Sequence, residues 1–170
     1  MRVAFLGKMR AGKNTAYNVC KGIAPGPELK FAEPLYLIQE YAQKLLGFKS
    51  EKDRTFLQLL GTDWARNIDE NVFVKYLQKK VESLKKSENL YVTDCRFPNE
   101  VEALKKLGFK LIWIDRPDDL RRAAGASNED HASENSVTSK HADVIVKNDD
   151  TQFVFAGRLI SAINSLEKNE

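Results

Sequence analysis

The sequence predicts an α/β fold, with a parallel sheet of five strands between helices on both faces. Short apolar runs alternate along the chain with longer segments in which apolar residues recur at helical spacing. Strands that alternate with helices in this way are typical of a mostly parallel sheet. Polar residues gather directly after three of the strand-like runs, and ligands bind beyond the carboxyl ends of strands in such sheets. A functional site is therefore expected at that edge.

The first half of the chain opens with a strand and then becomes mainly helical. An apolar run closed by Gly7 suits a buried parallel strand, and Pro34 is well placed in the first turn of a helix that Gly47 ends. This helix is expected to bury the stripe Leu35, Ile38, Ala42 and Leu45. The expected elements are, in order, a strand at 2–6, a helix at 13–21, a short strand at 29–32, the helix from Pro34, a helical region at 52–68 and a helix with the stripe Phe73, Leu77, Val81 and Leu84.

The second half repeats the alternation around one long irregular segment. The β-rich runs NLYVTDC at 89–95 and FKLIWI at 109–114 flank a helix that starts at Pro98 and stops at Gly108. Residues 116–140 are polar and small and have no periodicity, and so long a segment inside a compact domain is usually a lid or a binding loop. The remaining expected features are the inward stripe Val101, Leu104 and Leu107, a strand at 143–146 and a closing helix with the stripe Phe153, Ala156, Ile160 and Ile163.

A candidate phosphate-binding loop follows the first strand. Residues 7–15 read GKMRAGKNT and match the pattern G-x-x-x-x-G-K, in the strand–loop–helix context that this pattern requires. Its glycines allow backbone N–H groups to curl around phosphate oxygens, and the helix N-terminus adds a positive dipole end. Lys13 would reach the β- and γ-phosphates of a nucleotide. The alternative is an ordinary turn between a strand and a helix.

Asn14 stands where the phosphate-loop pattern has Ser or Thr, whose hydroxyl binds Mg²⁺. An Asn side-chain oxygen is also a hard, neutral donor, so Asn14 is a candidate metal ligand, directly or through water. Thr15 comes one residue later, about 100° round the helix, and is not expected to replace it.

The segment TDCRFPNE at 93–100 is a second candidate site at a strand end. Asp94 can hold the Mg²⁺ shell or a substrate hydroxyl, and Arg96 can bind a phosphate with its guanidinium fork. The alternative is that these two side chains pair with each other and only finish the strand.

The segment LGTDWARN at 60–67 places Asp63 and Arg66 at i and i+3 of a helix. As a bare pattern this spacing is most often a surface ion pair. Trp64 beside it is more often a core side chain than a platform for a base.

Three arginines, Arg116, Arg121 and Arg122, stand at the start of the irregular segment in RPDDLRR. Mobile arginines that close over a transferred phosphoryl group stabilise its charge, and the alternative is a solvated basic face. His131 and His141 are the only histidines and have no cysteine nearby, so a zinc site is not expected. The GxSxG pattern of serine hydrolases is absent.

Composition narrows the partners and the compartment. The net charge of +3 is too small to indicate a nucleic acid polymer as partner. No apolar run approaches the ~18 residues of a membrane span, and the N-terminus lacks the features of a signal peptide. Cys20 and Cys95 have no CxxC spacing and are expected as buried free thiols in a reducing compartment. A cytoplasmic protein is therefore expected.

The chain as a whole resembles a known family, the phage-type deoxynucleoside monophosphate kinases, a branch of the P-loop nucleoside monophosphate kinase fold. The motifs that carry the resemblance, in order, are GKMRAGKNT, KFAEPLY, FLQLLGTDWARN, VTDCRFPNEVEALKKLGF, IDRP, EDHASE and ADVIVKNDDT. They cover nearly the whole chain. The resemblance implies a three-layer P-loop NTPase fold as a single domain over residues 1–170. Within it, an acceptor-binding helical region would lie at about 32–88 and a mobile lid at about 116–140.

The resemblance also implies an activity, which is transfer of the ATP γ-phosphate to a (deoxy)nucleoside monophosphate with Mg²⁺ as cofactor. Asn14 departs from the family, where Asp is typical (GKDT), so a neutral amide replaces a carboxylate. The implied ATP-binding residues are Gly7, Lys8, Arg10, Ala11, Gly12, Lys13, Asn14, Thr15, Arg116 and Asn148. The implied acceptor-binding residues are Phe31, Ala32, Arg66, Asp94, Arg96, Phe97 and Glu134. The implied catalytic residues are Lys13, Asp94, Arg96, Arg121 and Arg122, and the implied metal ligands are Asn14 and Asp94.

Three other functions fit part of the same pattern. An animal-type phosphomevalonate kinase has similar landmarks, and a dephospho-coenzyme A kinase shares the sheet and the Asn after its last strand. A protein that binds ATP without transferring phosphate is suggested by Asn14. The intact strings RFPNE and GTDWAR favour the nucleotide kinase. The expected partners are then ATP and a nucleoside monophosphate, with the oligomeric state open and a homodimer included.

Overall fold

The computed structural model describes residues 1–85, 88–126 and 136–168 of the chain. It divides into two compact units. The first comprises Met1–Leu29 and Lys85–Glu170, and the second comprises Lys30–Leu84.

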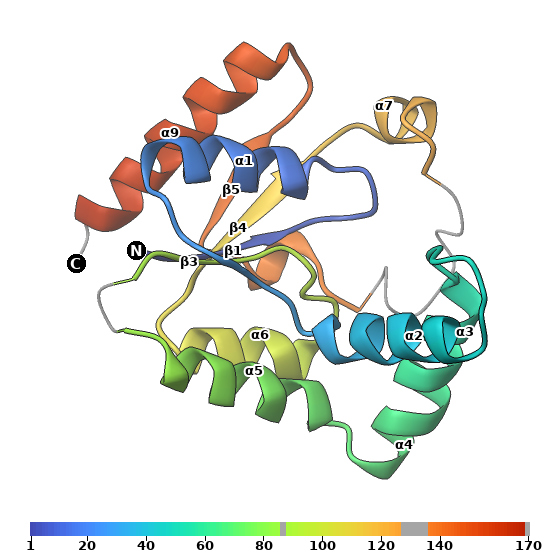
Figure 1. The fold of residues 1–170 in the computed structure, drawn as a ribbon. Coiled ribbons are helices and arrows are strands. Elements are labelled where there is room, and N and C mark those ends of the chain that lie inside the picture. Colours follow the sequence, from blue (N-terminus) through green and yellow to red (C-terminus); the bar gives the residue numbers. More distant parts are fainter. Residues whose placement is uncertain (86–87, 127–135, 169–170) are drawn as a thin grey trace. The chain divides into compact units, whose positions relative to one another are not determined.

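The first unit is built on a five-stranded parallel sheet with the strand order β2-β3-β1-β4-β5 (Figure 1). The central strand β1 pairs with β3 on one side and β4 on the other, so that Ala4 lies opposite Val92 and Leu111. The predicted parallel five-stranded sheet is therefore confirmed. The strands are β1 (Arg2–Leu6), β2 (Glu28–Leu29), β3 (Leu90–Val92), β4 (Lys110–Asp115) and β5 (Val144–Lys147).

Helices cover both faces of this sheet, which confirms the predicted three-layer arrangement. On one face, α1 (Lys13–Ile23) and α9 (Gln152–Lys168) lie side by side (Figure 1). Their buried residues join side chains of β1 and β4, such as Phe5 and Ile112, in one apolar core. On the other face lies α6 (Pro98–Lys106), which packs against β4.

Two expectations, one about a strand end and one about a helix stripe, were wrong at least in part. The second strand is only Glu28–Leu29, because the chain turns at Lys30 and Ala32 is already the N-cap of the next helix. The buried stripe of α9 is Phe155, Leu159 and Ile163, so the prediction was right for Ile163, whereas Phe153 is 87% exposed. The three buried residues recur at a spacing of four and share one face of the helix, and Phe153, two residues before Phe155, lies on another face.

The segment at 116–140 is also more regular than predicted. It contains a short helix, α7 (Asp118–Ala123), directly after β4, and a 3-10 turn at Ser139–His141. Helices this short contribute at most two turns, too few for a periodic stripe to reveal them. The middle of the expected lid, residues 127–135, lies outside the described residues.

The second unit is helical throughout. Its stripe on α5, with Phe73, Leu77 and Val81 buried, is confirmed, and Leu84 follows the helix end. The helical region predicted at 52–68 is present, but its middle is a π-helix. The elements are α2 (Glu33–Leu45), α3 (Arg54–Gln58), the π-helix η1 (Leu59–Ala65), α4 (Arg66–Ile68) and α5 (Val72–Ser83).

The stripe predicted for α2 was wrong in part. Leu35 is buried, but Ile38 and Leu45 are 45% and 71% exposed, and Gln39 is buried instead. The Gln39 amide donates to the carbonyl oxygen of Glu51 at 2.5 Å and accepts from the backbone N–H of Asp53 at 3.2 Å. Gln39 therefore turns inward because its amide hydrogen-bonds backbone groups of the loop that follows the helix. A search for apolar periodicity could not reveal such a residue.

Two further observations concern the described part of the chain. Cys20 and Cys95 are buried and carry free thiols, as predicted. Among the described residues, no helix has both the length and the apolar character needed to cross a bilayer.

Candidate functional site

The loop after β1 has the backbone of a phosphate-binding loop, and its two glycines are required by geometry. Gly7 and Gly12 have φ angles of 138° and 109°, which side chains rarely tolerate. A β-carbon at Gly7 would lie 2.7 Å from the carbonyl oxygen of Ile114. A β-carbon at Gly12 would lie 2.5 Å from the side-chain nitrogen of Asn148. The loop therefore passes too close to the ends of β4 and β5 for any other residue.

Side chains bind every backbone carbonyl from Gly7 to Ala11. Lys13 belongs to the loop itself, whereas the other three donors come from the segments after β4 and β5. The Nζ of Lys13 donates to Gly7 (2.5 Å) and Lys8 (3.0 Å), Arg121 donates to Met9 (3.2 Å), Arg116 donates to Arg10 (3.3 Å) and Asn148 donates to Ala11 (2.8 Å). Five consecutive carbonyls are thus fixed in direction by side chains of the protein itself.

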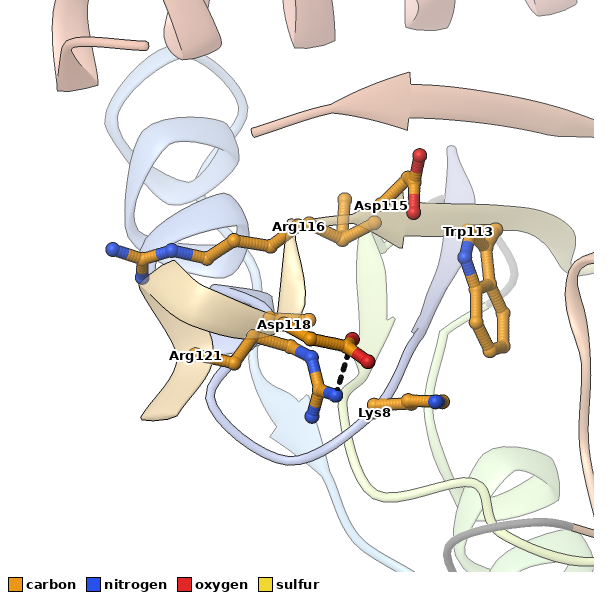
Figure 2. Close-up of a pocket in the computed structure, with 8 residues that line it drawn as sticks. Lys8, Trp113, Asp115, Arg116, Asp118 and Arg121 are labelled. Atoms are coloured by element: carbon orange, nitrogen blue, oxygen red, sulfur yellow. Dashed lines mark hydrogen bonds and ion pairs between the residues drawn. The ribbon is translucent and has the colours of Figure 1, made fainter. Parts of the chain in front are cut away.

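A pocket of about 100 Å³ opens between the loop, the end of β4 and the first turn of α7 (Figure 2). Figure 2 shows the guanidinium of Arg121 turned towards the carboxylate of Asp118, and the two groups are 2.6 Å apart. This hydrogen bond and the charge of Arg121 lower the pKa of Asp118, and the charge of Lys8 acts in the same direction. The other labelled lining residues are Trp113, Asp115 and Arg116.

The turn after β3 is shaped by a carboxylate from the start of α6. Glu100 is buried, and its Oε2 accepts the backbone N–H groups of Arg96 at 2.7 Å and Phe97 at 3.2 Å. Glu100 occupies the N3 position of α6 and so forms the carboxylate half of a capping box. Sequence reasoning assigned no role to this last residue of the RFPNE string, although its spacing from the helix start could have indicated one.

The phosphate loop and this turn follow two paired strands, β1 and β3, and the pKa of the Cys95 thiol responds to charges from both. Burial raises this pKa well above its usual value, and the charges of Glu100 and Asp94 raise it further. The charge of Lys13 acts in the opposite direction on the same thiol. Asp94 and Lys13 therefore both lie near enough to Cys95 for their charges to be felt there.

The candidate metal ligands are sparse. Asn14 is exposed in the first turn of α1, Thr15 next to it is half-buried, and Asp94 is half-buried after β3. In the described ranges, no group of three or more His, Cys, Asp and Glu side chains is arranged to hold a metal ion. His141 accepts a hydrogen bond from the backbone of Thr138 and caps a turn, whereas His131 lies outside the described residues.

In the second unit, Arg66 follows the π-helix and is held from two directions. Its guanidinium carbon lies 4.5 Å from the ring centre of Phe73, and its Nη1 donates to the Gly61 carbonyl at 3.1 Å. Gly61 is buried, and a β-carbon there would come within 2.7 Å of Leu35. Trp64 is 56% exposed, so the expectation of a core side chain was wrong.

The structure brings part of the predicted site together within the first unit. The loop residues of 7–15 are joined by Arg116, Arg121 and Asn148, and Asp94 follows β3, the strand paired with β1. Arg96 and Phe97 follow Asp94, and Arg122 is exposed on α7. Phe31 and Arg66 belong to the second unit, as does Ala32, and Glu134 lies outside the described residues. The role of each of these residues stays a prediction.

Comparison with known proteins gives a family and a fold. The family model "Deoxynucleotide monophosphate kinase" matches residues 49–154. The "Uncharacterized protein ORF77" of Ictalurid herpesvirus 1 (strain Auburn) is 32% identical over 161 residues, which are 92% of this chain and 68% of that protein. The "Putative deoxynucleotide monophosphate kinase" of Acanthamoeba polyphaga mimivirus is 26% identical over 193 residues, covering 96% of each chain.

Solved structures share the fold at low sequence identity. Shikimate kinase from Aquifex aeolicus is 17% identical with a TM-score of 0.60, and all of both chains is covered. Dephospho-CoA kinase from Campylobacter jejuni is 20% identical with a TM-score of 0.56, and 99% of each chain is covered. At these identities the likeness concerns the fold alone, which is that of the P-loop kinases.

Proposed function

Since this chain belongs to the deoxynucleotide monophosphate kinase family, and is therefore a nucleotide kinase, we propose that it transfers the γ-phosphate of ATP to a deoxynucleoside monophosphate. The products are a deoxynucleoside diphosphate and ADP. The family match favours this reaction over those of a phosphomevalonate kinase and a dephospho-coenzyme A kinase.

The observation that supports ATP as the donor is the loop Gly7–Lys13. Its fixed carbonyls and its position at the N-terminus of α1 suit the binding of a phosphate chain. Lys13 is bound to the Gly7 and Lys8 carbonyls, so its ammonium group must exchange these partners for phosphate oxygens when ATP arrives. Its charge would then stabilise the γ-phosphoryl group as it moves to the acceptor.

Asn14 and Asp94 fit the requirements of Mg²⁺. Both offer hard oxygen donors, and Mg²⁺ in kinases typically takes one or two protein ligands together with phosphates and water. So small a number of protein ligands agrees with the few oxygen-donor side chains that the described residues offer near the phosphate loop. When bound, Mg²⁺ neutralises charge on the β- and γ-phosphates. Asn14 would contribute an amide oxygen in place of the family's usual carboxylate.

Asp94 and Arg96 are proposed to face the acceptor, because they follow β3 beside the phosphate loop. Arg66 is proposed to bind the acceptor phosphate, and Phe31, Ala32 and Phe97 are proposed as further acceptor-binding residues. The support for Arg66 is its pre-set guanidinium, which the Phe73 ring and the Gly61 carbonyl orient. The acceptor needs no general base, since a phosphate dianion is already a nucleophile. Arg116, Arg122 and Glu134 are proposed for the lid side.

The reaction is tested with ATP, Mg²⁺ and a panel of the four common deoxynucleoside monophosphates and their ribose counterparts. ADP formation is followed for each acceptor against a reaction without acceptor. Phosphomevalonate and dephospho-coenzyme A, the acceptors of the two alternative kinases, are tested in the same way. We expect ADP above the blank with at least one deoxynucleoside monophosphate and with neither of these two compounds. If no nucleotide in the panel supports ADP formation, the proposal fails.

A further inference from the structure

We propose that Arg121, oriented by Asp118, is a positioning residue that holds the phosphate loop in its ATP-binding shape. This role deepens the proposed function and rests on it, because it assigns Arg121 to the loop and not to the transferred phosphate. The family resemblance implied a mobile lid arginine at this position. The structure instead places the Arg121 guanidinium inside the first unit, in contact with a loop carbonyl.

The contacts of Arg121 are those of a fixed side chain. Only 1% of its surface is exposed. One terminal nitrogen donates to the Met9 carbonyl at 3.2 Å, and the other is 2.6 Å from the Asp118 carboxylate. A planar guanidinium can serve two such partners at once, and a buried charge is retained where it is paired. Asp118 therefore sets the direction in which Arg121 reaches the loop.

The loop needs support at this place because its tip is strained. Arg10 has a φ of 62°, and a residue with a side chain adopts this conformation only where its surroundings enforce it. The carbonyls on the two sides of this strained peptide unit belong to Met9 and Arg10, and Arg121 and Arg116 bind them. Both arginines come from the segment directly after β4. The strain at the tip is thus held by side chains more than a hundred residues away in sequence.

The neighbouring Arg122 has the opposite character. It is exposed on the same short helix, whereas Arg121 is buried. If either arginine moves over the transferred phosphate, the exposed one can do so without first leaving the core and breaking the ion pair with Asp118. The two residues, treated alike on sequence grounds, therefore divide into a positioning side chain and a solvent-facing one.

The test compares ATP binding and turnover in Arg121→Lys, Asp118→Asn and the double variant. Lysine keeps the charge but cannot serve the carbonyl and the carboxylate with one planar group. We expect calorimetric ATP affinity, measured without acceptor, to fall about tenfold in each single variant, the typical effect of one lost charged hydrogen bond. We expect the double variant to be no weaker than Arg121→Lys, since both changes remove the same interaction. The KM for ATP should rise more than kcat falls.

Two control variants separate this role from general damage. Asp119→Asn removes an acidic side chain from the same turn of α7. Arg2→Gln removes an arginine that donates to the Leu107 carbonyl at 2.6 Å, at the opposite end of β1 from the loop. Both controls should bind ATP as the unmodified protein does. Melting temperatures of all variants report whether each one folds.

Several results would overturn the inference. One is unchanged ATP affinity with a lower kcat in Arg121→Lys, which would indicate that Arg121 contacts the transferred phosphate and does not position the loop. Another is normal ATP binding by Asp118→Asn, and a third is additive losses in the double variant. If Arg121→Lys does not fold, Asp118→Asn decides alone, because its side chain is half exposed and its loss leaves the core intact. If the unmodified protein binds ATP but phosphorylates no nucleotide, the proposed function fails. The ATP affinities of the variants then still test whether Arg121 positions the loop.

Discussion

The phosphate loop and the turn after β3 follow neighbouring parallel strands, yet different kinds of contact hold them in shape. The loop depends on Arg116, Arg121 and Asn148, which reach it from distant segments. The turn depends on Glu100, which caps the backbone three and four residues before it. The contacts described for the loop thus come from several parts of the chain, whereas those described for the turn come from Glu100 of the same segment. The shape of the loop therefore depends on contacts between segments far apart in the sequence, and the shape of the turn depends on contacts between neighbouring residues.

The largest expected effect concerns the loop's own lysine. Lys13→Met removes the charge that would meet the γ-phosphate but leaves the contacts from distant segments in place. We expect ADP formation to fall by about a thousandfold or more, because one charged donor to a transferred phosphate has this value. The melting temperature should change little. Retained turnover would refute the role of the loop in the reaction.

The next effect breaks a distant contact of the loop. Gly12→Ala places a β-carbon against the Asn148 amide and enforces an unfavourable φ, so we expect the free energy of unfolding to fall by about 1–3 kcal/mol. The matched control is Gly22→Ala in α1, where nothing lies within 4 Å. There alanine should stabilise by about 0.5–1 kcal/mol. Urea unfolding of both variants measures the difference, and equal effects would contradict the close approach at Gly12.

A smaller effect tests the locally held turn. Glu100→Gln keeps the shape of the side chain but loses the charge on the oxygen that accepts two N–H groups, so we expect a loss of about 1–2 kcal/mol in the free energy of unfolding. ATP affinity should stay near normal, since the loop has its own supports. Glu102→Gln, on the exposed side of the same helix, is the control. A strong loss of ATP affinity in Glu100→Gln would show that turn and loop are not held separately.

The last effect is a pH dependence of stability. Burial raises the pKa of Cys20 to about 12, and burial with nearby carboxylates raises the pKa of Cys95 well above its usual value. Unfolding releases these thiols to their ordinary pKa, so above about pH 9 the unfolded chain loses protons that the folded chain keeps. The free energy of unfolding should therefore decrease as pH rises through this range. Cys95→Ala should show a shallower decrease in urea titrations at about pH 8 and about pH 10, and an unchanged slope would count against the burial of Cys95.

Sequence reasoning succeeded where the determinants are close together along the chain. The run Arg2–Leu6, the glycines of GKMRAGK and the helix starts at Pro34 and Pro98 are local signals, and each is confirmed in place. The parallel sheet followed from the alternation of these local elements.

Sequence reasoning failed where one segment depends on another. Gln39 turns inward because a loop more than ten residues later needs its amide, and Arg121 is buried because Met9 lies beside it in space. Neither partner can be read from spacing along the chain. Asp118 was overlooked for a different reason. Its i,i+3 spacing from Arg121 is a helical pair, but the helix that makes the pair is too short to be recognised.

The π-helix Leu59–Ala65 gives the second unit a place that can absorb a change in length. A π-helix closes its hydrogen bonds five residues back, so it accommodates about one residue more per turn than an α-helix. Removing one residue from this stretch would allow an ordinary α-helix of nearly the same total rotation, whereas a deletion inside an α-helix rotates the next segment by about 100°. Arg66 lies directly after the π-helix, with its guanidinium over Phe73. A one-residue deletion within the π-helix would thus leave this arginine aimed nearly as it is, whereas one within α5 would not leave the following residues in place.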